Sequence, residues 1–154
     1  MKYDGSLADS LAEENGLTGV LPFELQELTS LAYLQLEEGL IGGTIPSEFG
    51  NLSTLLVLDL NVNNITGSIP NTLYALENLK QLDLDTNSLS GSISTEIALL
   101  VNLDFLQLHG NRFTGTIPAE LGLLSNLGKL SKMRFQLRLL RSLNFLFQVL
   151  RHSR

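Results

Sequence analysis

The chain has 154 residues, which is the size of one ordinary domain, and it contains no cysteine. A disulfide framework, a thiolate metal site and a cysteine nucleophile are therefore excluded. Its 16 acidic and 10 basic side chains give a formal net charge of -6, which argues against nucleic acid as a partner because phosphate binding needs a basic surface.

The charges are divided unevenly along the chain. Residues 1–127 contain all 16 acidic side chains and only three basic ones, whereas residues 128–154 contain seven basic side chains and no acidic one. An acidic segment and a basic segment therefore share one chain, and we expect them to differ in structure or in role.

Glycine, asparagine and proline recur at a spacing of 24 residues or its multiples. Glycine and asparagine each fill one column: Gly19, Gly43, Gly67, Gly91 and Gly115, with Asn15, Asn63, Asn87 and Asn111. All four prolines fall in a third column: Pro22, Pro46, Pro70 and Pro118. So many coinciding columns identify a tandem repeat, in which each unit is too small to fold alone and stacks on its neighbours.

One unit reads L-x-x-L-x-L-x-x-N-x-L-x-G-x-I-P-x-x-L-x-x-L, and its cleanest copy runs from Leu79 to Leu100. The pattern resembles the plant-type leucine-rich repeat, whose hallmark is the L-x-G-x-I-P segment, over about residues 7–130. The resemblance implies an α/β repeat solenoid, a right-handed coil with a short parallel sheet on its concave face and 3-10 or irregular turns on its convex face. It also implies a non-catalytic module for protein or peptide recognition, resembling a fragment of a receptor-like protein or receptor-like kinase ectodomain.

The residue types support that fold on physical grounds. In Leu55-x-x-Leu58-x-Leu60 the last two leucines follow the period of two that is typical of a strand. We expect the asparagine amides to form a hydrogen-bonded ladder where each turn leaves its strand. The glycine column permits a backbone arrangement that a Cβ would hinder, and proline fixes φ at the following turn.

In chain order, the array is imperfect at both ends. Residues 7–15 are a degenerate first unit, with Ser10 and Ala12 where leucine is expected, and Gly39 interrupts the asparagine column. Beyond residue 130 the repeat frame fails. We therefore expect an array over residues 1–130, with four near-complete repeats, and a separate basic amphipathic tail over residues 131–154.

The tail places four leucines on one helical face, Leu139, Leu143, Leu146 and Leu150. It is too short and too basic for a membrane span. Three interpretations stay open: a cap that covers the last repeat, a non-native extension, and a basic helix that binds anionic lipid or a calmodulin-like protein through residues 134–151.

Targeting signals do not stand out at the N-terminus, because aspartates interrupt residues 1–10 and no apolar segment is present there. No compartment follows from the sequence itself, whereas the resemblance implies an extracellular or membrane-anchored parent protein. Two sequons begin at Asn51 and Asn64, and we interpret both asparagines as ordinary turn residues. The sequence predicts no particular oligomeric state.

The candidate ligand-binding residues are the side chains that the strands would turn outward on the concave face. They form three columns across neighbouring turns: Tyr33, Val57, Gln81 and Phe105; Gln35, Asp59, Asp83 and Gln107; Glu37, Asn61, Asp85 and His109. We expect them to form an exposed acidic panel with Tyr33 and Phe105 as aromatic anchors. Such a panel predicts a basic protein or peptide partner.

Catalysis, metal binding and a cofactor are not expected. Asp59, Asp83 and Asp85 lack the spacing of a calcium loop, and an open sheet offers no pocket that would tune a catalytic carboxyl. A second reading of the chain is a structural or polysaccharide-adsorbing surface formed by rows of small hydroxyl residues: Thr18, Thr66, Ser90 and Thr114, beside Thr44, Ser68, Ser92 and Thr116.

Overall fold

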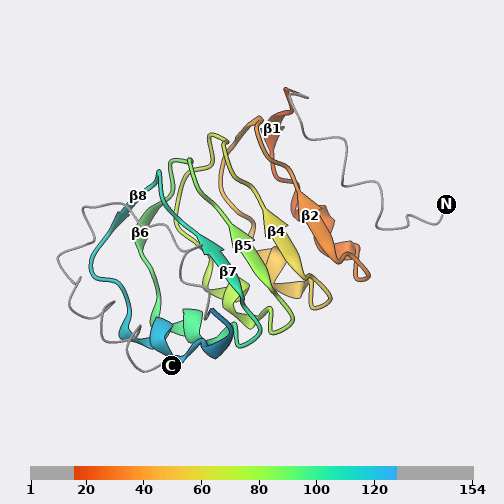
Figure 1. Ribbon diagram of the computed structural model, residues 1–154. Helices are drawn as coiled ribbons and strands as arrows, with labels where there is room; N and C mark the ends of the chain where they lie inside the picture. The colour runs from red at the N-terminus through yellow and green to blue at the C-terminus, as the bar shows by residue number, and fades with distance from the viewer. Residues whose placement is uncertain (1–15, 128–154) are drawn as a thin grey trace.

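A computed structural model describes residues 16–127, which form a coil of stacked turns (Figure 1). One side of the coil carries a four-stranded parallel sheet in the order β2 (Tyr33–Gln35), β4 (Val57–Asp59), β5 (Gln81–Asp83) and β7 (Phe105–Gln107). Asn15, the degenerate first unit and the tail over residues 131–154 lie outside the described residues. The expected solenoid with parallel strands is confirmed.

The pairing register of this sheet follows the repeat. Tyr33 pairs with Val57, Val57 with Gln81 and Gln81 with Phe105, each 24 residues further along the chain. The middle residue of each strand points inward, as Leu58 and the equivalent leucines do. Residues on either side of it point to the opposite face, which we call the concave face.

A second set of strands, which the sequence analysis did not foresee, lies on another side of the coil. Strands β1 (Thr18–Val20) and β3 (Leu40–Gly42) pair in parallel, as do β6 (Ser90–Ser92) and β8 (Arg112–Thr114). A parallel bridge between Thr44 and Thr66 lies in the turns between these pairs. The partners here are 22 residues apart, so Thr18 lies opposite Leu40.

Short 3-10 helices form the remaining side, as expected. They are η2 (Phe23–Glu27), η3 (Ser47–Asn51), η4 (Asn71–Ala75), η5 (Thr95–Leu99), η6 (Ala119–Leu123) and η7 (Ser125–Leu127). A proline precedes η2, η3, η4 and η6, with extended backbone such as φ -63° and ψ 137° at Pro46. Ser94 precedes η5 instead, and its hydroxyl accepts a hydrogen bond from the backbone N–H of Glu96, which is ordinary N-capping.

The core is a continuous column of leucine and isoleucine side chains between these three sides. Leu58, Leu82 and Leu106 from neighbouring strands are buried, and Ile65 and Leu89 from the next segment are fully buried beside them. Each turn therefore covers the apolar side chains of the next, which is how a repeat too small to bury its own leucines becomes stable.

The asparagine ladder is present where the sequence predicts it. The side-chain oxygen of Asn63 accepts a hydrogen bond from the backbone N–H of Ile41 at 3.1 Å, and its amide donates to the carbonyl of Leu36 at 2.7 Å. Asn87 and Asn111 repeat this arrangement one and two turns later. At Gly39 the rung has no side chain, as expected.

The glycine column has two reasons for its composition. Gly43 and Gly67 have φ of 72° and 79°, a left-handed backbone that side chains with a Cβ rarely adopt. A Cβ on Gly67 would also lie 2.9 Å from Cγ2 of Thr44, and one on Gly43 would lie 2.9 Å from Cγ1 of Val20. The residue after each glycine thus packs over the glycine of the next turn.

A second ladder, which the sequence analysis missed, joins the turns before the sheet. The side-chain amides of Asn78, Asn102 and Asn126 donate to the carbonyls of Ser53, Glu77 and Val101, each 25 residues earlier. The Thr54 hydroxyl takes the same position one turn earlier and donates to Thr29 and Leu31. These asparagines also recur every 24 residues, so the signal was present in the sequence.

Candidate functional site

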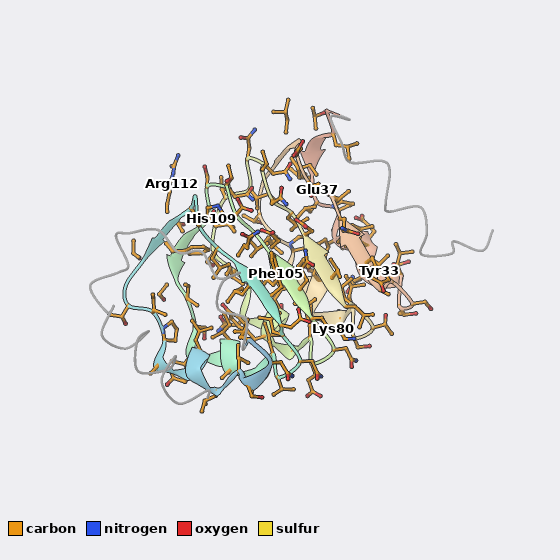
Figure 2. All side chains as sticks on the ribbon, in the orientation of Figure 1. Tyr33, Glu37, Lys80, Phe105, His109 and Arg112 are labelled. Carbon is orange, nitrogen blue, oxygen red and sulfur yellow. The ribbon has the colours of Figure 1, made fainter. Side chains whose placement is uncertain are left out.

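The sheet brings the predicted columns together on the concave face. Parallel pairing places Gln35, Asp59, Asp83 and Gln107 side by side, and Tyr33 and Phe105 come from the first and last strands of the sheet (Figure 2). The predicted placement of these side chains is therefore confirmed, whereas their role in binding a ligand stays a prediction.

The expected exposure of the acidic panel is wrong for its central members. Asp59 is 5% exposed, Asp83 is 2% exposed and Asp85 is 9% exposed. Their oxygens are covered by longer neighbouring side chains that hydrogen-bond to them, instead of being presented to solvent. Alternation along a strand predicts the face on which a side chain lies, but it does not predict how far neighbours cover it.

Asp59 is held from three directions. One side-chain oxygen accepts hydrogen bonds from the backbone N–H of Asn61 at 3.2 Å and from the Asn61 amide at 2.9 Å. The other oxygen accepts from the Gln81 amide at 3.2 Å. The Asn61 amide also donates to Glu37 at 3.3 Å, so residues from three neighbouring turns form one polar network.

Asp83 repeats the arrangement one turn later with a different neighbour. Its carboxyl accepts hydrogen bonds from the backbone N–H of Asp85 at 3.2 Å and from the Gln107 amide at 2.6 Å. At the position of Asn61, this turn carries Asp85, a second carboxyl. The amide that neutralises part of the charge around Asp59 is thus replaced by a group that adds to it.

Burial changes the acidity of both buried carboxyls. Desolvation raises the pKa of Asp59 to about 6, and the nearby charges of Glu37 and Asp85 raise it further against the opposing hydrogen bonds from Asn61. Desolvation raises the pKa of Asp83 to about 7, with an added contribution from its side-chain hydrogen bond to Asp85. At neutral pH the concave face therefore carries less negative charge than a count of its aspartates suggests.

His109 closes this network at the last turn. Its Nε2 lies 3.2 Å from a side-chain oxygen of Asp85, and the hydroxyl of Thr86 donates to the same oxygen at 2.8 Å. Nδ1 of His109 is buried and has no hydrogen-bond partner within the described part of the chain. The sequence analysis placed His109 beside Asp85, and the structure confirms that neighbourhood.

The side chains that a partner would meet first lie around the buried acids. Tyr33 is 42% exposed, while Val57 and Phe105 in the same column are half-buried. Gln35, Glu37, Asn61, Gln81, Gln107 and His109 are also half-buried. The face thus consists of amide and aromatic groups over a layer of carboxyls, and it is not a row of exposed acids.

A strained column borders the site. Glu38, Val62 and Thr86 have φ of 54°, 51° and 51°, and Gly110 continues the column with φ of 64°. The left-handed region is costly for β-branched residues such as Val62 and Thr86. Sequence reasoning identified this column but could not foresee its conformation, because the residue types give no signal for it.

The two rows of small hydroxyl residues lie on and beside the second set of strands. In the first row, the hydroxyls of Thr66, Ser90 and Thr114 donate to the carbonyls of Gly43, Gly67 and Gly91 in the preceding turn. In the second row, Thr44, Ser68, Ser92 and Thr116 are exposed. The first row therefore joins neighbouring turns, and the second is open to solvent.

Metal and membrane features were also sought in residues 16–127. This part of the chain brings together no group of three or more histidine and acidic side chains suited to a metal ion. Its helices are all too short, or not apolar enough, to cross a membrane.

Comparison with protein families agrees with this architecture. The family described as "Leucine rich repeat" matches residues 29–89, and a further leucine-rich repeat match covers residues 102–124. The chain belongs to the leucine-rich repeat family. Among curated protein sequences, none matches it.

Solved structures of plant proteins share this fold. The chain is similar to the ectodomain of the receptor kinase SOBIR1 from Arabidopsis thaliana, with 31% identity, a TM-score of 0.71, and coverage of 80% of this chain and 64% of that one. It is also similar to the Arabidopsis receptor kinase HAESA in complex with the peptide hormone IDA and the co-receptor SERK1. That match has 36% identity, a TM-score of 0.68, and coverage of 70% and 18%.

A plant ice-binding protein is similar as well, with 32% identity, a TM-score of 0.62, and coverage of 69% of this chain and 34% of that one. The chain thus spans less than two thirds of the length of each of these three structures. These neighbours agree with a leucine-rich repeat unit like those of receptor-like ectodomains.

Proposed function

We propose that this chain recognises a protein or peptide through its concave face. The observation that carries the proposal is the set of side chains in fixed columns on β2, β4, β5 and β7, with an aromatic residue on each outer strand. HAESA, a similar structure, is known in complex with a peptide hormone, which supports a peptide as one class of partner.

Rigidity is the physical basis of the proposed recognition. The Asp59 and Asp83 carboxyls and the Gln81 and Gln107 amides are already hydrogen-bonded in the free chain. A partner therefore meets ordered side chains, and little rotamer entropy is lost on association. Recognition would then use the exposed ring of Tyr33 and the partly exposed amides, because large rigid side chains are favoured at interface centres.

Charge supports a partner of basic character. Residues 16–127 contain twelve acidic side chains and only two basic ones, Lys80 and Arg112. The resulting field would speed the encounter with a cationic partner and would weaken with added salt.

Peptide display against the full chain tests this function. We expect peptides enriched in Lys and Arg to be selected, and Tyr33→Ala with Phe105→Ala to weaken their binding by about tenfold or more, as loss of hot-spot residues does. Leu99→Ala is the matched control, because Leu99 is a large exposed apolar residue on η5, away from the sheet. Equal loss in the control, or selected peptides that ignore the double variant, would contradict a concave binding face.

A second candidate function is adsorption to an ordered surface or polysaccharide through the exposed hydroxyl row, Thr44, Ser68, Ser92 and Thr116. The similarity to a plant ice-binding protein favours this reading. Ser68→Tyr with Ser92→Tyr would disrupt a flat contact on this side and should abolish adsorption to ice or insoluble polysaccharide. The concave double variant should leave adsorption unchanged, so the two functions are separable by mutation.

Membrane attachment by the tail is a third reading, and the tail lies outside the described residues. Deletion of residues 131–154 should abolish binding to vesicles that contain anionic lipid, if the tail is the attachment element.

A further inference from the structure

Titratable side chains near β5 and β7 form one connected chain on the concave face. Gln107 donates to Asp83, and the backbone N–H of Asp85 donates to the other oxygen of Asp83. Nε2 of His109 lies 3.2 Å from Oδ2 of Asp85. Two carboxyls and an imidazole from adjacent turns are thus linked, in surroundings where both carboxyls are almost completely buried.

The position of a proton in this chain follows from the available acceptors. The carboxyls of Asp83 and Asp85 are hydrogen-bonded to each other, and such a bond requires a proton on one of them. A second proton on the His109 ring would lie on Nδ1, which is buried and has no acceptor among residues 16–127. The geometry therefore favours holding the proton between the carboxyls.

We propose that Asp83 and Asp85 share one proton, bordered by His109, and that its release sets the charge of the concave face and so the strength with which the face binds a cationic partner. The inference rests on the proposed recognition function, since it assigns a regulation to the same face. Binding would be weak in acid and would strengthen as the pH rises.

Every titratable group that faces this pair acts in the same direction. Asp59 on β4 and Glu37 after β2 become negative as the pH rises, and His109 loses positive charge. Neither Lys80 nor Arg112 forms an ion pair with the cluster in the described part of the chain. The raised pKa values of Asp59 and Asp83, about 6 and about 7, place the change between mildly acidic and neutral pH.

Carboxyl carbon NMR on the full chain tests proton sharing without any partner. From pH 4 to pH 8.5 we expect the Asp83 and Asp85 carboxyl signals to titrate together in two steps, the later one near neutrality. Asp85→Asn should reduce Asp83 to a single step. Asp104→Asn is the control, because Asp104 is exposed beside β7 and its loss should leave both signals unchanged. Independent titration of the pair, like that of Asp104, would overturn proton sharing.

Binding of an octalysine peptide tests the consequence, since lysine charge is constant over this range. At fixed ionic strength, the full chain should bind the peptide about tenfold more tightly at pH 8 than at pH 5, the effect of about one added charge near the surface. The difference should vanish in the Asp59→Asn, Asp83→Asn double variant and persist in Asp104→Asn.

The two experiments separate the two proposals. Equal octalysine affinity at both pH values, or no binding at either, would overturn the pH control even if the NMR shows a shared proton. Octalysine binding that rises with pH but is unaffected by Tyr33→Ala with Phe105→Ala would instead contradict the concave face as the recognition surface.

Discussion

The side-chain oxygen of Asn87 accepts a hydrogen bond at 3.0 Å from the backbone N–H of Ile65, which lies 22 residues earlier and one turn away. The amide of the same side chain donates to the carbonyl of Leu60, also in the preceding turn, at 2.8 Å. One buried asparagine thus satisfies backbone groups that no strand pairs, and it joins consecutive turns where the core alone would let them slide.

Replacing this asparagine should be costly. Asn87→Ala leaves the Ile65 N–H and the Leu60 carbonyl buried without partners, so we expect the free energy of unfolding to fall by about 2–4 kcal/mol. Urea denaturation followed by circular dichroism measures the change. Asn64→Ala serves as the control, because Asn64 is exposed, and its loss should cost less than about 0.5 kcal/mol. Similar losses in the two variants would contradict the ladder's role.

Two glycines with nearly the same backbone separate steric contact from conformational strain. Gly67 and Gly91 have φ of 79° and 80°, but an added Cβ meets Thr44 at 2.9 Å in the first case and Ser68 at 3.4 Å in the second. Alanine at either position should cost about 1–2 kcal/mol from strain. Gly67→Ala should cost about a further 1 kcal/mol from overpacking, measured by thermal melting. A larger loss at Gly91 would show that this contact does not matter.

Relief of strain at Val62 should stabilise the chain. Its φ of 51° is unfavourable for a β-branched residue, and its side chain is 41% exposed, so little packing is lost on removal. Val62→Gly should raise the free energy of unfolding by about 0.5–1 kcal/mol, the left-handed penalty less the added chain entropy. Val62→Ala keeps the Cβ and should give no gain. Destabilisation by glycine would mean that the Val62 side chain contributes more packing than strain.

The buried acids make stability depend on pH with a definite sign. The pKa values of Asp59 and Asp83 are raised above 3.8, to about 6 and about 7, so the folded chain binds more protons than the unfolded chain between these values. The free energy of unfolding should therefore be highest near pH 4, fall as the pH rises, and level off above about pH 7.

Denaturation at pH 5 and pH 8 checks this dependence. We expect a loss of about 1–3 kcal/mol in the full chain and a smaller one in Asp83→Asn, which removes one of the two ionisations. Asp104→Asn should keep the full dependence, since Asp104 is exposed. Stability that rises with pH over this interval would contradict the assignment of the raised pKa values.

Much of the fold could be predicted because the repeat is written in residues with narrow structural uses. The columns of Asn87 and Leu58 specified the ladder, the inward strand positions and the 24-residue register of the main sheet. The pairing of Thr18 with Leu40 could not be predicted, because its 22-residue offset comes from the path of the coil and not from the repeat.

The candidate site was predictable in position but not in character. Period-two alternation placed Asp59 and Asp83 on the concave face, yet their burial depends on amides that lie one turn further along, at Gln81 and Gln107. Whether an amide bends over a carboxyl is decided by three-dimensional contacts between turns. The same holds for Val62, whose left-handed backbone is imposed by the turn around it and contradicts its own preference.

Each ladder asparagine is covalently part of one turn and hydrogen-bonded to the turn before it, by the same atoms each time. Removal or duplication of one whole unit, such as residues 64–87, would therefore return every remaining rung to an equivalent partner. A deletion of any other length would bring unlike positions together along the entire coil. The chain can change its span in steps of one turn while the chemistry that joins the turns stays the same.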